Sequence, residues 1–191
     1  MLVAGTAAIR PSQLFRELSA SDLCDRDVVN SAGILRDTMD AAAQQRRPSC
    51  IYTLGYEGRG IGDFLATLLG ARVTDILDVR EHASSRKLGF SRQMLSRLAA
   101  RIGITYHHTP QLGVPREHRE LFGHLSTVAT ARSEYRKRVE RESADVLAEA
   151  GDLCRSGRVA LVCYERDVRY CHRFALSMLL RDITHLEVRH L

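Results

Sequence analysis

From residue 50 onward, short apolar runs alternate with longer amphipathic stretches. The strand candidates are short and contain many β-branched or aromatic residues: "CIYTL", "VTDILDV", "ITYHH", "RVALVCY" and a last alternating run, "THLEVRHL". The stretches between them have the apolar spacing or the composition of helices: "IGDFLATLLGAR", "RQMLSRLAARIG", "SEYRKRVERESADVLAEAGDLCRSG" and "YCHRFALSMLLRD". Strands that alternate with helices predict a Rossmann-like α/β fold, with a mostly parallel β-sheet and helices on both faces.

Local signals set some of the helix limits. Ser91 stands where it can cap the second helix, and Gly103 and Gly157 stand at C-terminal stops. The pattern predicts one continuous helix ending at Gly157. A long polar stretch runs from Thr109 to about Arg132, between the third strand candidate and the next helix candidate.

The first 48 residues have a different pattern. They contain "PSQLFREL" and "DVVNSAGILRDTMDAAAQQRR", whose apolar residues recur at helical spacing, and Pro48 stands where a helix should stop. We therefore predict a helical N-terminal extension over residues 1–48 and an α/β domain over residues 49–191.

Composition narrows the class of protein. Apolar residues make up 45% of the chain, and no run approaches the roughly 18 apolar residues of a membrane helix, so we expect a cytoplasmic protein without a membrane partner. The net charge of +5 is compatible with nucleic-acid binding, although an arginine bias also arises from genome composition. The five cysteines lack C-x-x-C spacing, so we expect reduced thiols.

Polar residues follow each of the first four strand candidates. In a doubly wound sheet, ligands bind outside the carboxyl ends of the strands. The residues that this rule selects are Gly55 and Tyr56 after the first strand, Asp78, Arg80 and Arg86 after the second, His107 after the third, and Cys163 and Glu165 after the fourth.

Two of these strand ends leave alternatives open. The loop "GYEGRGIG" could bring backbone N–H groups to a phosphate, or it could be only a tight turn. Asp78 and Arg80 lie on one face of a strand, because side chains alternate with a period of two. They could be a general base beside an anion-binding arginine, or a pair that only satisfies itself.

The segment "LVCYERDVRYCHR" allows three interpretations. Cys163, Glu165, Cys171 and His172 could bind zinc, a cysteine could be a nucleophile, or the thiols could be buried structural groups. Adjacent helical residues point in different directions and there is no second cysteine pair. The sequence therefore assigns no metal ligand, and a structural metal or redox thiol site stays an alternative.

Arg173 breaks a local rule. With Ser177 and Arg181 it forms a polar stripe, which predicts that it lies on the solvent or cleft side of its helix. A cation in the first turn of a helix is disfavoured by the macrodipole, so this arginine indicates anion recognition. Neutralisation by Glu165 or Asp167 is the alternative.

Four ordered blocks carry a family resemblance. "YTLGYEGRGIGDFL", "DVREHASSRKLGF", "ITYHHTPQLG" and "LVCYERDVRYCHR" resemble domain of unknown function family 488, whose pattern ends in C-x-E…C-H-R. The resemblance implies a Rossmann-like domain and no particular activity. It supports as site residues Gly55, Asp78, Arg80, Arg86, His107, Cys163, Glu165, Cys171, His172 and Arg173.

The leading functional prediction is an enzyme that acts on a phosphate-bearing ligand, a nucleotide or a nucleic acid. The predicted catalytic residues are Asp78, Glu165, His172 and Cys163, and the predicted ligand-binding residues are Gly55, Tyr56, Arg80, Arg86, His107, Cys171 and Arg173. A non-catalytic binding module is the alternative, and the sequence does not decide between the two. It indicates no particular cofactor or oligomeric state.

Overall fold

The computed structural model describes residues 48–191, so the predicted helical extension lies outside the described residues, apart from Pro48. The strands are β1 (Cys50–Gly55), β2 (Asp75–Asp78), β3 (Thr105–His108), β4 (Arg158–Cys163) and β5 (Val188–His190). The α-helices are α2 (Ile61–Gly70), α3 (Arg92–Arg101), α4 (Val128–Glu142), α5 (Ala144–Ser156) and α6 (His172–Thr184). Short 3-10 helices are η2 (Pro110–Leu112), η3 (Arg116–Gly123) and η4 (Val168–Tyr170).

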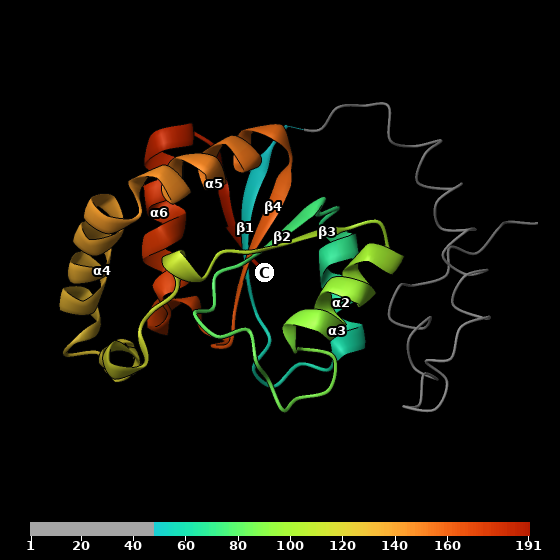
Figure 1. Ribbon diagram of the computed structural model, residues 1–191, viewed down its shortest axis with the longest axis horizontal. Coiled ribbons are helices and arrows are strands. Elements are labelled where there is room, and N and C mark those ends of the chain that lie inside the picture. The colour runs from blue at the N-terminus through green and yellow to red at the C-terminus, as the bar shows by residue number, and fades with distance from the viewer. Residues whose placement is uncertain (1–47) are drawn as a thin grey trace, which may run out of the picture.

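The five strands form one parallel sheet in the order β3-β2-β4-β1-β5. Helices α2 and α3 cover one face, and α4, α5 and α6 cover the other (Figure 1). This arrangement confirms the predicted Rossmann-like α/β fold. None of the helices in residues 48–191 is long and apolar enough to cross a membrane.

The strand order creates a crevice between β2 and β4. The two strands are neighbours, and Asp78 at the end of β2 is in register with Val162 near the end of β4. The chain leaves β2 through α3 toward β3, whereas it leaves β4 through α6 toward β5 at the other edge. Such a divergence is the topological switch point where ligands bind in doubly wound sheets.

The central strands are buried on both faces, which explains their nearly continuous apolar sequences. In β4, Val159 and Leu161 contribute to the cluster beneath α4, α5 and α6. Ala160 and Val162 contribute to the opposite cluster with α2 and α3. The end of β4 is therefore held by two cores, which gives a rigid support to the residues that follow it.

The predicted single helix before β4 is wrong at Ser143. This residue separates α4 from α5, with φ −139° and ψ 30°, and its hydroxyl donates a hydrogen bond to the carbonyl of Gln111 (3.4 Å). Its own backbone N–H still bonds to Val139, and its carbonyl accepts from Leu147. One buried serine thus ends one helix and begins the next.

Candidate functional site

A pocket of about 410 Å³ lies at the carboxyl ends of β1, β2 and β4. We call it the strand-end pocket. Its lining residues come from the last residue of β4, from the loops after the three strands, from the segment that contains η3, and from the first residue of α6. A larger hollow of about 670 Å³ lies between η3 and α4, but none of the predicted site residues lines it. The strand-end pocket is therefore the candidate site.

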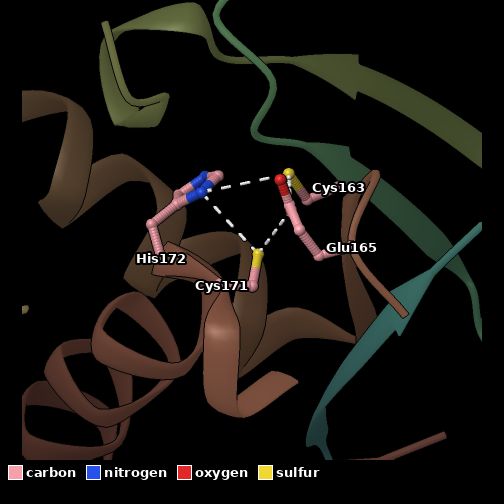
Figure 2. A group of neighbouring side chains, drawn as sticks. All are labelled: Cys163, Glu165, Cys171 and His172. Carbon is pink, nitrogen blue, oxygen red and sulfur yellow. Dashed lines mark hydrogen bonds between the residues drawn. The ribbon is translucent and has the colours of Figure 1, made fainter. Parts of the chain in front are cut away.

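Two thiols, a carboxylate and an imidazole meet at this pocket (Figure 2). One potential ligand atom from each of Cys163, Glu165, Cys171 and His172 lies within 4.8 Å of the other three. Both sulfur atoms donate to Oε2 of Glu165, at 3.0 Å each. We call this group the four-residue cluster. Cys163, Glu165 and His172 also line the strand-end pocket, whereas Cys171 does not.

The connection between β4 and α6 builds the cluster. Cys163 is the last residue of β4, and Cys171 is the N-cap of α6, with its sulfur accepting the backbone N–H of Arg173 (3.5 Å). Gly55 lets this connection approach β1, because a Cβ at Gly55 would lie 1.8 Å from the carbonyl oxygen of Glu165. Gly55 therefore acts on the site through backbone clearance.

His172 presents a defined nitrogen to the cluster. Its Nε2 lies 3.1 Å from the carbonyl oxygen of Val79, and a carbonyl can only accept a hydrogen bond, so Nε2 carries a proton. In the neutral ring, Nδ1 then keeps its lone pair, and it faces the sulfur atoms of Cys171 and Cys163 at 3.7 and 3.9 Å. The imidazole can thus accept a proton or coordinate a metal ion at Nδ1.

The cluster changes the acidity of its members. The hydrogen bond with Cys171 and burial raise the pKa of Cys163 well above its ordinary value. Burial raises the pKa of Glu165, but the hydrogen bonds from the two thiols, a backbone hydrogen bond and the charge of His172 together outweigh burial and hold that pKa below its usual range. At neutral pH, Glu165 is therefore a carboxylate, and the sulfur atoms of Cys163 and Cys171 both donate hydrogen bonds to it.

Arg173 is not on the solvent or cleft side of α6, which corrects the prediction from the polar stripe. Its side chain is 1% exposed. The guanidinium turns back toward the β4–α6 connection, where Nη1 donates to the carbonyl of Glu165 (2.6 Å) and contacts the Cys171 sulfur (3.4 Å). The helical repeat predicts the direction of the Cα–Cβ bond, but a long side chain in a first turn can fold back over carbonyls that precede the helix. Arg173 therefore stabilises the positions of Glu165 and Cys171 through these two contacts.

Asp78 and Arg80 form the closed pair that the sequence left as an alternative. Nε and Nη2 of Arg80 donate to the two carboxylate oxygens at 2.8 and 2.5 Å, and the exposed fractions are 0% for Asp78 and 5% for Arg80. Nη1 donates to Tyr56 Oη and to the Phe90 carbonyl, at 2.9 Å each, and Tyr106 donates to Asp78 (2.6 Å). Although burial opposes it, the contacts with Asp78 raise the pKa of Arg80. Arg80 lines the pocket, whereas Asp78 does not reach it and its carboxylate is already saturated with hydrogen bonds.

The remaining predicted residues divide between two places. Tyr56 and the exposed Arg86 line the strand-end pocket. His107 does not reach it, since Nε2 of His107 bonds to Asp75 (2.9 Å) and its ring lines a separate hollow of about 240 Å³. His107 and His108 lie at the carboxyl end of a strand, as the rule for ligand sites requires. That strand, β3, is an edge strand and lies two strands away from β4, so they are distant from the pocket.

The sequence did not single out Arg119. It lies in η3, lines the pocket, and donates to Glu81 (3.0 Å) and to the carbonyl of Val114 (3.0 Å). The polar stretch that contains it has no periodicity that would have placed it at the carboxyl edge of the sheet.

Comparison with known proteins agrees with the resemblance seen in the sequence. The model of a family described as Domain of unknown function DUF488 matches residues 60–180, which is more than half of the chain and includes the whole four-residue cluster. No curated protein and no solved structure matches the chain.

Proposed function

Because the chain belongs to the DUF488 family, a domain of unknown function, we propose its function from its own geometry. The protein is an enzyme that acts on a phosphate-bearing ligand, a nucleotide or a nucleic-acid end, in the strand-end pocket. The observation that carries this proposal is that three members of the four-residue cluster, Cys163, Glu165 and His172, line one pocket together with Arg86 and Arg119. The free cysteines of residues 48–191 fit a reducing compartment, and we place the enzyme in the cytoplasm.

Arg86 is the main group that recognises the phosphate. Arg119 assists through Nη1, because its Nε and Nη2 donate to Val114 and Glu81. The guanidinium of Arg80 is already paired with Asp78, and Arg173 is buried, so neither is available to a phosphate. Arg86 is exposed, and within residues 48–191 no hydrogen bond or ion pair of its guanidinium is present. Ser84 and Ser85 lie on the same loop and line the same pocket, so they add hydroxyl donors. A phosphate in this pocket gains charge-assisted hydrogen bonds from an exposed arginine.

Glu165 supplies the acid–base chemistry. It belongs to both the cluster and the pocket lining, and its lowered pKa keeps it ionised at neutral pH. Asp78 is less suited to this role because its two oxygens are occupied and its side chain has no exposed surface. His172, beside Glu165, offers the second proton acceptor at Nδ1.

The test is ligand binding with a matched arginine control. Thermal shifts are measured for the wild type, Arg86→Ala and Arg97→Ala with inorganic phosphate, nucleoside monophosphates and a 5′-phosphorylated oligonucleotide. Arg97 is an exposed arginine of α3 that does not line the pocket, so its loss changes the net charge equally. We expect at least one probe to stabilise the wild type and Arg97→Ala, by about 2.7 kcal/mol at 100 times its Kd. Arg86→Ala should bind that probe about 10- to 100-fold more weakly, because a charge-assisted hydrogen bond is worth about 1.5–3 kcal/mol.

Turnover separates an enzyme from a binding module. Any probe that binds is incubated with the wild type and with Glu165→Gln, and its products are measured by mass spectrometry. An enzyme of this design converts the probe, and Glu165→Gln binds it without converting it. Binding by both proteins without conversion would favour the non-catalytic module, and equal shifts for Arg86→Ala and the wild type would remove the proposed phosphate site.

A further inference from the structure

We propose that the four-residue cluster is a zinc site, with Cys163, Cys171 and His172 as the fixed ligands and Glu165 as an exchangeable fourth ligand. The cluster contains the donor types that Zn²⁺ prefers, two sulfurs, one imidazole nitrogen and one carboxylate oxygen. Binding of the ion does not depend on the proposed phosphate chemistry, whereas its use as the reactive centre does.

The donor atoms lie near the separations of a tetrahedral site, all within 4.8 Å of one another. With bonds of about 2.3 Å to sulfur and about 2.0–2.1 Å to nitrogen and oxygen, the donors of a tetrahedral zinc site lie about 3.3–3.8 Å apart. Nδ1 of His172 lies 3.7 and 3.9 Å from the two sulfur atoms. Each sulfur lies 3.0 Å from Glu165 Oε2. Side-chain adjustments of about half an ångström to an ångström bring such donors to ligand distance.

The surroundings of the cluster are those of a metal centre. Metal-ligating histidines usually donate their other ring N–H to a carbonyl or carboxylate, which fixes the tautomer. Nε2 of His172 does this with Val79. The sulfur of Cys171 accepts the backbone N–H of Arg173 and faces its Nη1. N–H donors stabilise a thiolate more than a neutral thiol.

The charge of a zinc site in this cluster would explain why the Arg173 guanidinium is buried. Within residues 48–191 no carboxylate forms a salt bridge with this arginine, although a buried charge without a partner is costly. Two thiolates and one carboxylate exceed the charge of Zn²⁺ by one negative charge. The Arg173 guanidinium, at 3.4 Å from the Cys171 sulfur, supplies the compensating positive charge. A disulfide between Cys163 and Cys171 carries no charge. It would not explain why the Arg173 guanidinium is buried, or why Glu165 and Nδ1 of His172 lie beside the sulfur atoms.

The ion would be open to the pocket on one side. Cys163, Cys171 and His172 are buried, whereas Glu165 is half-buried and lines the pocket. Catalytic zinc sites keep three protein ligands and one exchangeable position. Glu165 therefore marks the position where water or a ligand oxygen would reach the ion, and the released carboxylate could still accept a proton.

The experiment titrates reduced, chelator-treated full-length protein with Zn²⁺ against a chromophoric competitor, and with Co²⁺ followed by absorbance. We expect one ion per chain, a thiolate-to-cobalt charge-transfer band, and release of about two protons as both thiols ionise. Cys163→Ser and Cys171→Ser should lose the charge-transfer intensity and bind Zn²⁺ at least about 100-fold more weakly. Cys50→Ser and Cys154→Ser are the controls, because these buried thiols lie outside the cluster, and they should bind like the wild type.

The wild-type spectrum keeps the test valid even if a cluster variant fails to fold. Absence of stoichiometric Zn²⁺, or a Co²⁺ spectrum without thiolate bands, would overturn the metal site. A Cys163–Cys171 disulfide in the purified protein, with no metal binding after reduction, would also overturn it in favour of a redox pair. Zn²⁺ binding is measured without any phosphate probe, so failure of the proposed function would leave this result unchanged.

Discussion

The Arg80–Asp78 pair allows a sharp test of whether Arg80 is part of the pocket wall or a ligand anchor. Both side chains are almost fully buried, and two short hydrogen bonds join them. Removing one partner from such a pair leaves an uncompensated buried charge, which costs about 3–5 kcal/mol. We therefore expect Arg80→Met to lower the free energy of unfolding by about 3–5 kcal/mol. Tyr106 would also donate to a carboxylate that has lost its counter-charge.

The assay is urea unfolding followed by circular dichroism, for Arg80→Met, Asp78→Asn and the double variant. Because the double variant removes both charges, it should cost less than the sum of the two single changes, by about 2–3 kcal/mol. The matched control is Arg136→Met, which breaks an exposed pair with Asp182 (3.0 Å) and should cost less than about 1 kcal/mol.

Two results would refute this reasoning. One is a cost for Arg80→Met no larger than that of the exposed control, and the other is simple additivity of the two single changes. If Arg80→Met kept its stability and lost a phosphate-dependent thermal shift, Arg80 would be a ligand anchor, as the sequence first indicated.

Two further predictions concern Gly55 and Cys154. Gly55→Ala should destabilise the protein by about 3 kcal/mol, because the new Cβ would clash with the Glu165 carbonyl. The control is Gly70→Ala, whose Cβ would meet no atom within 4 Å and which should be neutral or stabilising by up to about 1 kcal/mol. Equal melting temperatures of the two variants would contradict this prediction. Burial raises the pKa of Cys154 from 9.0 to about 12, so the unfolded chain loses its thiol proton first and stability falls as the pH rises above 9. Between pH 8 and pH 10 the wild type should lose about 1 kcal/mol more than Cys154→Ala, and parallel pH profiles of the two unfolding free energies would disprove this assignment.

The fold could be predicted from the sequence because each element has its own periodic signal. The apolar runs that become β1, β2 and β4 are short and buried on both faces, and Gly103, with φ +76°, ends α3 where expected. The break at Ser143 could not be predicted, because good helix formers stand on both sides of it. It depends on tertiary contacts, among them the hydrogen bond to Gln111.

The site could be predicted only at the level of the strand ends. The rule for parallel sheets selected Cys163 and Glu165, and also His107, because a sequence does not give the order of the strands. That order separates β3 from β4 by β2. The burial of Arg173 depends on the path of a long side chain, which neither periodicity nor spacing specifies.

The four-residue cluster is unusual in how little of the chain it needs. All four side chains lie within ten consecutive residues, on the turn between one strand and the next helix. Sites assembled from distant segments form only after long loops have closed, and closing a loop costs more entropy as the loop becomes longer. Here the donors are neighbours as soon as β4 and the first turn of α6 exist. The chemistry of the cluster can therefore assemble early in folding, while the strand-end pocket in front of it must wait until β1, β2 and η3 have docked.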